Sequence, residues 1–178
     1  MEFGKNLIEQ IRSNSAFVME YGPNFERMIQ LADEVFASRT DPDQIDVNED
    51  VLDHLRAIHP AAVCEHATEE GPVAWVLLFP TTEALMNDFL NGKISERALM
   101  ELTPLQTSYS ALYLCSAMVL AEHRRQGIAL RLCLDAIDSM RTEHPIQHLF
   151  VWTFSEEGRF AAEAVARHAG LPLLLKNH

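Results

Sequence analysis

The feature that most constrains this chain is an unbroken apolar run that is followed by a short polar turn and an amphipathic segment. The run covers 111–120 and lacks polar alternation, which predicts a central strand buried on both faces. From Gly127 onward, apolar side chains recur with a 3.6-residue period, which predicts a helix. The predicted apolar stripe consists of Leu130, Cys133, Leu134, Ile137 and Met140. The sequence therefore predicts a strand, a tight turn and a helix that begins near glycine.

The turn between strand and helix has the composition of an anion-binding site. The first N–H groups of a helix have no partner inside the helix, and the helix dipole adds partial positive charge there. Gly127 and Ala129 keep large side chains away from these N–H groups, and Arg124 and Arg125 add two positive charges. The pattern predicts a cradle for a group such as a pyrophosphate. It is not a P-loop, because no Gly-Lys-Ser/Thr follows, nor a Rossmann fingerprint, because it has only one glycine.

The run Arg124-Arg125-Gln126-Gly127-Ile128-Ala129 resembles the Arg/Gln-x-x-Gly-x-Gly/Ala signature of the GCN5-related N-acetyltransferase (GNAT) superfamily. The strand that ends in Met118-Val119-Leu120 and the helix that follows stand where that family has them. The resemblance implies acetyl-CoA as a cosubstrate between the fourth and fifth strands, which splay apart in that family. Its pyrophosphate would meet the turn at 124–129, and its pantetheine amides would pair with the backbone of 118–120. The alternative is an ordinary strand–turn–helix with a surface arginine pair.

Chain length, net charge and the positions of the cysteines further restrict the class of protein, its partners and its compartment. A chain of 178 residues fits a single domain, 1–178, with a sizeable core. The net charge of −12 argues against nucleic acid or an anionic membrane as a partner. The cysteines, Cys64, Cys115 and Cys133, lie far apart in apolar segments and are typical of reduced core thiols. No apolar run approaches a membrane span, so we expect a cytoplasmic protein.

The order of predicted elements defines a fold class. Strands are expected at 17–21, 61–67, 73–79, 111–120, 148–154 and 171–175, and helices at 5–12, from Asn24, from Asn48, at 82–90, at 95–102, from Gly127 and at 156–169. This is an α/β (α+β) fold, GNAT-like, with a mixed central sheet of about six strands flanked by helices. In the last helix, Phe160, Ala161, Ala164 and Val165 are expected to face the core.

A helical insertion at 80–110 separates the third and fourth predicted strands, and it is far longer than a hairpin connection needs. We therefore expect it to form a flap near the acceptor site or a homodimer contact. Phe89 and Met100 decide this question, because packing of both into their own domain core would remove the motive for either role.

Two stretches contain residues of the types that bind metal ions, but neither is predicted to form a metal site. Counted from Asp41, the calcium-loop positions that need a ligand, a glycine and a glutamate hold Ile45, Asp46 and Leu52. The triplet 64–66, Cys-Glu-His, has no further ligands at suitable spacing. We therefore predict no metal. In the resembled family the region between the first two helices borders the acceptor groove, so the carboxylates of Asp41, Asp43 and Asp46 are candidates to attract an amine.

The chain departs from the family at its catalytic end. Alignment on Gly170-Leu171 places Ala166 where the family often has a tyrosine general acid. The strand position where some members carry a base carboxylate falls on Tyr113. A phenol titrates near pH ~10, so Tyr113 is a poor base but can donate a proton or a hydrogen bond. Tyr113 is therefore the candidate catalytic residue, with a core aromatic as the alternative. Other titratable groups nearby are Cys115, Glu122 and His123.

These expectations define three functional hypotheses. The first is an acetyl-CoA-dependent N-acetyltransferase that acts on a primary amine of a small molecule or peptide by direct attack in a ternary complex. The second is a non-catalytic acyl-CoA-binding or protein-interaction module that has lost the tyrosine acid. A dimeric scaffold built on the inserted helices is a third. Nothing in the sequence identifies the acceptor.

Overall fold

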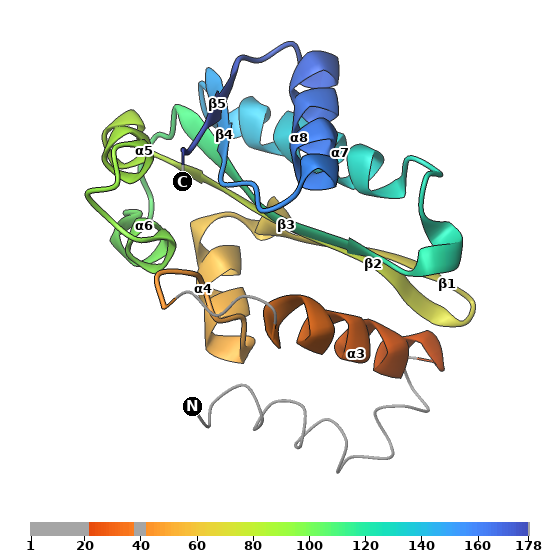
Figure 1. The fold of residues 1–178 in the computed structure, drawn as a ribbon. Coiled ribbons are helices and arrows are strands. Elements are labelled where there is room, and N and C mark those ends of the chain that lie inside the picture. The colour runs from red at the N-terminus through yellow and green to blue at the C-terminus, as the bar shows by residue number, and fades with distance from the viewer. Residues whose placement is uncertain (1–21, 38–41, 178) are drawn as a thin grey trace.

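The structure is a computed structural model, and it describes residues 22–37 and 42–177. These residues form six α-helices and a five-stranded sheet (Figure 1). The helices are α3 (Asn24–Ala37), α4 (Glu49–Ile58), α5 (Glu83–Leu90), α6 (Glu96–Leu102), α7 (Ile128–Glu143) and α8 (Glu156–Ala169). The strands are β1 (Val63–Thr68), β2 (Gly71–Thr81), β3 (Ala111–Val119), β4 (His148–Val151) and β5 (Leu173–Leu175), and the short 3-10 turns are η1 (Pro60–Ala62) and η2 (Ala121–His123).

The sheet is open and mixed, with the strands in sequence order from β1 to β5. β1 pairs antiparallel with β2, and β2 pairs antiparallel with β3. β3 and β4 run parallel, as do β4 and β5. The predicted α/β class with a mixed sheet is therefore confirmed. The expected helix at 5–12 and strand at 17–21 lie outside the described residues, so five of the six expected strands are observed.

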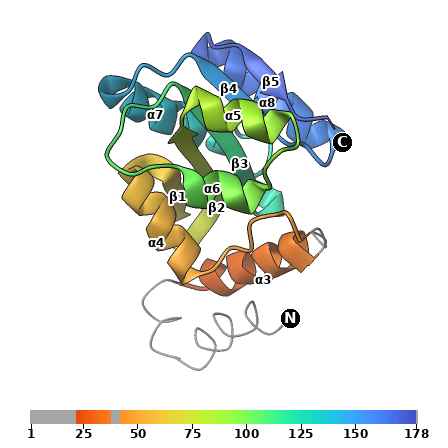
Figure 2. The same ribbon diagram turned by 90° about the vertical axis from the view of Figure 1, so that its left-hand side faces the viewer.

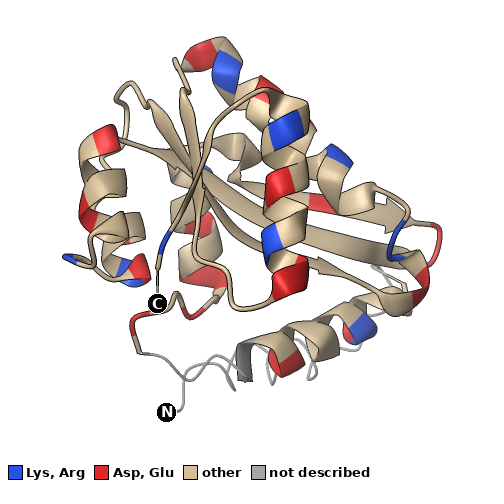
Figure 3. Ribbon diagram, turned by 45° about the horizontal axis from the view of Figure 1, so that its top comes forward, with Lys and Arg blue, Asp and Glu red and all other residues tan. Residues whose placement is uncertain are grey.

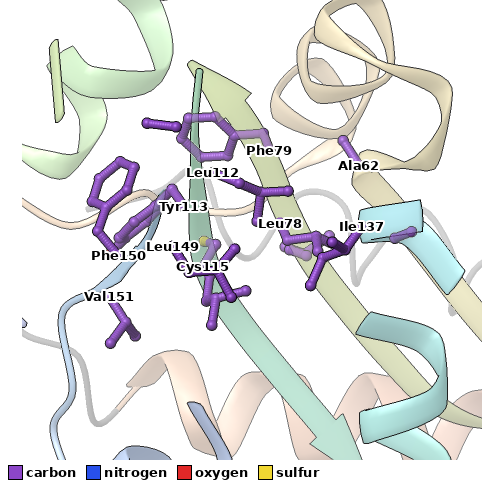
Figure 4. Close-up of a cluster of buried hydrophobic side chains, with 14 of the residues drawn as sticks. Ala62, Leu78, Phe79, Leu112, Tyr113, Cys115, Ile137, Leu149, Phe150 and Val151 are labelled. Carbon is purple, nitrogen blue, oxygen red and sulfur yellow. The ribbon is translucent and has the colours of Figure 1, made fainter. Parts of the chain in front are cut away.

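The helices form layers on both faces of the sheet. α3 and α4 lie on one face, α7 and α8 lie on the other, and α5 and α6 lie at one end (Figures 1 and 2). Part of the core lies between the sheet and α3, where Met28 packs with Met118, Leu120 and Ile128. The larger part joins the strands to α4–α8 and includes Phe79, Tyr113, Phe150 and Ile137, as Figure 4 shows.

Local side-chain hydrogen bonds explain where several helices begin. The Asn48 Oδ1 atom accepts from the Val51 N–H at 2.9 Å, which starts α4 as the sequence predicts. Thr82 and Ser95 cap α5 and α6 in the same way. Gly170 ends α8 with a φ of 66°, a left-handed conformation that glycine adopts without steric cost.

The helical insertion lies where the sequence predicts it, between β2 and β3. Two of its apolar side chains are not available to a partner, because Phe89 exposes 0% of its surface and Met100 exposes 4%, whereas Leu102 and Leu105 are exposed. Both belong to the domain core. The motive for a flap or a homodimer contact is therefore absent at these two residues.

Two predicted features differ in detail. The strand expected at 148–154 ends at Val151, because the chain turns away from β3 there and leads to α8. Phe160 is 56% exposed instead of facing the core, and the Arg159 guanidinium carbon lies 4.7 Å from the centre of its ring. The buried face of α8 consists of Ala162, Val165 and Ala166. An alanine-rich helix offers two adjacent apolar stripes, and packing on α7 selects between them.

Candidate ligand cleft between β3 and β4

A cleft opens where β3 and β4 separate. The two strands pair from Ala111 opposite His148 to Leu114 opposite Val151, and there β4 ends. β3 continues for five more residues to Val119, where no other strand among the described residues pairs with it on that side. Ala117 is consequently exposed, although it lies on the central strand of the sheet. The sequence alone predicts this strand to be buried along its whole length, which is wrong at Ala117.

The cleft has a volume of about 990 Å³, which is at the upper end of the range for small-molecule sites, roughly 300–1,000 Å³. Its walls come from α3, β2, β3, α7, α8 and the segment that follows β4. The lining includes Leu31, Val35, Gln44, Val76, Leu114–Val119, Arg124, Ala129, Leu130, Cys133, Val151–Ser155, Ala161, Ala164 and Val165. Because α3 and α8 lie on opposite faces of the sheet, the cleft reaches both faces.

The free edge of β3 turns backbone groups toward the cleft. The Leu120 N–H donates to the Val73 carbonyl of β2 at 2.9 Å, so it faces away from the cleft. The Val119 carbonyl instead accepts from the Arg124 Nε atom at 3.0 Å. Because backbone groups alternate along a strand, the N–H and C=O of Ala117 face the same side as those of Val119. Of the three residues whose backbone is predicted to pair with pantetheine, Val119 turns its carbonyl toward the cleft, whereas Leu120, and by alternation Met118, turn their backbone groups toward β2.

The predicted cradle lies at one end of this cleft. Arg124 and Ala129 line the cleft directly. Arg125 has a φ of 60° and Gly127 a φ of 73°, so both adopt left-handed conformations. For Arg125 that conformation costs about 1–2 kcal/mol. Gly127 immediately precedes α7, and no side chain caps the first turn of this helix.

The other residues of the signature have structural roles. Gln126 donates from Nε2 to the Glu122 carbonyl at 3.0 Å and thereby closes the turn. Ile128 is buried against the α3 side of the core. Neither side chain lines the cleft.

Glu122 is held as a carboxylate by α3. Its Oε1 atom lies 2.6 Å from the Arg27 Nη1 atom. This hydrogen bond, with the charge of Arg27, lowers the pKa of Glu122 to about 2. A carboxylate with so low a pKa is a weak proton acceptor at neutral pH, which removes Glu122 from the candidate bases.

Tyr113 lies in the core beside the cleft and not on its wall. Its side chain exposes 0% of its surface and packs between Phe79 and Phe150, as Figure 4 shows, with ring centroids 5.5 Å and 5.0 Å away. Its hydroxyl donates to the Glu96 Oε1 atom at 2.6 Å. A catalytic role for Tyr113 stays a prediction, and the observed contacts are those of a core residue with a satisfied hydroxyl.

Glu96 is the residue that sequence analysis missed. It exposes 1% of its surface, although it is charged and begins a short helix. Its carboxylate accepts from the Ile45 N–H at 2.8 Å, from the Tyr113 hydroxyl and, at 3.9 Å, from the Cys115 Sγ atom. Its only signal in the sequence is its place after Ser95, where acidic residues are common. The insertion thus contributes a buried carboxylate that lies next to a cleft-lining cysteine.

Two polar atoms of the cleft wall lack a hydrogen-bond partner among the described residues. They are the Gln44 Oε1 atom and the Ser116 Oγ atom. Gln44 is only 5% exposed, so water does not satisfy it freely. A buried polar atom without a partner costs roughly 1–3 kcal/mol. A ligand that donates a hydrogen bond to Gln44 would recover part of that free energy.

A smaller, polar pocket of about 310 Å³ adjoins the cleft. It is lined by Asp43, Gly92, Lys93, Ile94, Ser95, Glu96, Trp152 and Lys176. Trp152 lines both spaces, and Asp43 precedes the cleft residue Gln44. Figure 3 shows that residues of both charge signs occur around the α5–α6 loop on this side of the molecule.

A histidine pair lies outside both spaces. His59, Glu143 and His144 offer three side-chain atoms within 4.8 Å of one another. The His59 Nδ1 atom accepts from the Ala61 N–H at 3.0 Å, so the neutral ring carries its proton on Nε2. That nitrogen lies 3.5 Å from the Glu143 Oε1 atom without forming a hydrogen bond to it, and in this tautomer it has no lone pair for a metal. Burial lowers the pKa of His144, with a further contribution from His59.

The three cysteines are free thiols, and Cys115 and Cys133 are buried. Burial raises the pKa of Cys133 to about 12 and also raises that of Cys64. These two cysteines are therefore protonated and poor nucleophiles at neutral pH.

Comparison of the chain with protein-family models, with curated protein sequences and with solved structures finds no match. No helix in the described ranges is both long and apolar enough to cross a membrane.

Proposed function

We propose that the chain is an acetyl-CoA-dependent N-acetyltransferase that acts on a primary amine, as its resemblance to the GNAT superfamily implies. The observation that carries the proposal is the separation of the parallel strands β3 and β4 after only four paired residues. An extended thioester cofactor needs a long slot, a backbone edge to pair with and a site for its phosphates. The cleft offers the slot, Ala117 and Val119 offer the edge, and the first turn of α7 offers the phosphate site.

The charges at the end of the cleft support the assignment of the cofactor's phosphates. Free N–H groups at a helix start, together with the Arg124 and Arg125 side chains, favour an anion in a chain that is otherwise strongly acidic. Both arginines are exposed, so neither is neutralised by burial with a carboxylate. The left-handed Arg125 is consistent with a turn whose conformation serves a ligand.

The reaction needs an amine and a thioester held together. An ammonium group first loses a proton to solvent. The nitrogen of the neutral amine then forms a bond to the acetyl carbonyl carbon, the carbon–sulfur bond breaks, and the proton that the nitrogen releases ends on the CoA sulfur. Positioning alone can supply several kcal/mol of such a reaction's barrier, roughly 7–11 kcal/mol in well-aligned cases. The absence of a tyrosine on α8 is therefore compatible with catalysis.

Calorimetric titration with acetyl-CoA and with desulfo-CoA tests the proposal. We expect micromolar binding that weakens at least tenfold in an Arg124→Ala/Arg125→Ala double variant. The matched control is Arg56→Ala/Arg167→Ala, which removes the same charge from exposed helix positions on α4 and α8. No binding to the unchanged protein would overturn the proposal. If both double variants lost the same affinity for acetyl-CoA, the effect would come from net charge and not from a specific site at Arg124 and Arg125.

A second candidate, a non-catalytic acyl-CoA-binding module, is favoured by one observation. Ala166, at the position of the family's tyrosine, is 6% exposed and packs in the core, so no hydroxyl reaches the cleft from there. This candidate predicts tight binding of acetyl-CoA without thiol release in the presence of any amine.

A further inference from the structure

We propose that the polar pocket beside the cleft binds the acceptor, and that the acceptor is a free amino acid, with its amino group toward the carboxylate of Asp43 and its carboxylate on Lys176. This inference rests on the proposed function, because it names the substrate class of the same site. It starts from the composition of the pocket wall, because Asp43, Lys93, Glu96 and Lys176 are among the residues that line a space of about 310 Å³.

The Lys176 ammonium is available to an anionic ligand. One of its N–H groups donates to the Phe89 carbonyl at 3.0 Å, and it lies 4.1 Å from the centre of the Phe89 ring. It lies 5.1 Å from the centre of the Trp152 ring. No carboxylate among the described residues forms an ion pair with it. A carbonyl and two aromatic faces hold the cation in place without neutralising it.

Lys93 is already paired with a carboxylate. Its ammonium lies 3.0 Å from the Asp88 Oδ1 atom, and its side chain is 66% exposed. An exposed, paired ammonium gives little additional binding free energy to a carboxylate. The two lysines thus line one pocket but differ in what they can offer a ligand.

The amino group of the ligand would meet Asp43 and its neighbour Gln44, where the pocket adjoins the cleft. Glu96 contacts Cys115, which lines the cleft, and Trp152 belongs to both spaces. Gln44, the neighbour of Asp43, offers the cleft an Oε1 atom that needs a hydrogen-bond donor. A nitrogen held near Gln44 would therefore lie next to the cleft in which the proposed thioester would bind.

The charges of the pocket favour one class of amine as its ligand. A polyamine carries only positive charges and would meet Lys176 with like charge. The amino terminus of a peptide lacks a carboxylate on the adjacent carbon, so Lys176 would have no partner. A free amino acid offers an amino group to Asp43 and a carboxylate to Lys176, and the volume of the pocket suits a molecule of that size.

The test measures binding of the twenty standard amino acids by saturation-transfer NMR, with and without saturating CoA. Each binder is compared with its α-amide and with the acid that lacks its amino group. We expect at least one amino acid to bind, and its amide and its deaminated acid to bind at least tenfold more weakly. No binding in the panel at millimolar concentration, or equal binding of the amide, would overturn the inference.

Three variants localise the binding. Lys176→Gln and Asp43→Asn should each weaken it at least tenfold, whereas Lys93→Gln should change it less than threefold. Equal losses in the two lysine variants would contradict the assignment of Lys176. Thermal unfolding of each variant checks that the fold is intact, and Asp43→Asn, at an exposed position, keeps the test decisive if Lys176→Gln unfolds.

The outcomes separate this inference from the function on which it rests. Acetyl-CoA binding with no amino acid binding would leave the proposed function standing and overturn the inference. Amino acid binding without acetyl-CoA binding would overturn the proposed function and leave the pocket assigned. Thiol release with formation of the N-acetyl amino acid would support both.

Discussion

The hydroxyl of Tyr113 on β3 donates a 2.6 Å hydrogen bond to the buried carboxylate of Glu96 on α6. This contact joins the inserted helices to the central strand across seventeen residues of sequence. It explains why a charged residue can lie in the core, because Glu96 also accepts from the Ile45 N–H. It also gives the insertion a defined place beside the cleft.

Removal of this carboxylate should be strongly destabilising. Glu96→Ala removes the acceptor of two buried hydrogen bonds, those from Tyr113 Oη–H and from the Ile45 N–H, and we expect the free energy of unfolding to fall by about 2–4 kcal/mol. Tyr113→Phe should cost about 1–2 kcal/mol, and the double variant less than the sum of the two. Urea unfolding measures all three, with Glu101→Ala, an exposed residue of the same helix, as the control. A Glu96→Ala variant as stable as that control would contradict the buried contact.

Substitutions at two glycines distinguish the cost of backbone strain from an effect on ligand binding. Gly127 and Gly170 both have left-handed backbones, with φ values of 73° and 66°, and a Cβ at either would meet no atom within 4 Å. Substitution of either by alanine should therefore cost a similar 1–2 kcal/mol, approximately. Only Gly127→Ala should weaken acetyl-CoA binding in calorimetry, because only there would the ligand approach the backbone. Equal affinities of the two variants would show that nothing lies against Gly127.

The cleft can be filled without disturbing the core. Ala117 is exposed on β3, so Ala117→Phe adds a ring to the cleft and should change the free energy of unfolding by less than about 0.5 kcal/mol. We expect acetyl-CoA binding to be lost. The control is Ala67→Phe, the same change at an exposed alanine of β1. Unchanged affinity in Ala117→Phe would place the ligand elsewhere.

Stability should fall at mildly acidic pH because of His144. Burial lowers the pKa of His144 in the folded state, so below about pH 6.5 the unfolded chain binds more protons than the folded one. The free energy of unfolding should thus decrease as the pH falls from 7.5 to 5.5. His144→Gln should reduce this slope, whereas the surface variant His168→Gln should not. Urea unfolding at the two pH values measures the slopes, and identical slopes in all three proteins would exclude His144 as their source.

The local sequence determined most of the secondary structure. Asn48 and Ser95 begin their helices through side-chain hydrogen bonds to backbone N–H groups three residues ahead, and such contacts need no tertiary partner. The apolar period after Gly127 produced α7 in the predicted position. The resulting order of elements was enough to predict a mixed α/β sheet and the place of the insertion.

Only the tertiary structure decided the burial of Glu96, the separation of β3 from β4 and the existence of the polar pocket. Each depends on groups far apart in sequence, as when Lys176 meets Phe89 across 87 residues. The phase of α8, with Phe160 outward, was likewise set by packing on α7. Sequence patterns report short-range preferences of the backbone, whereas these features arise when distant side chains compete for one space and for the same hydrogen-bond partners.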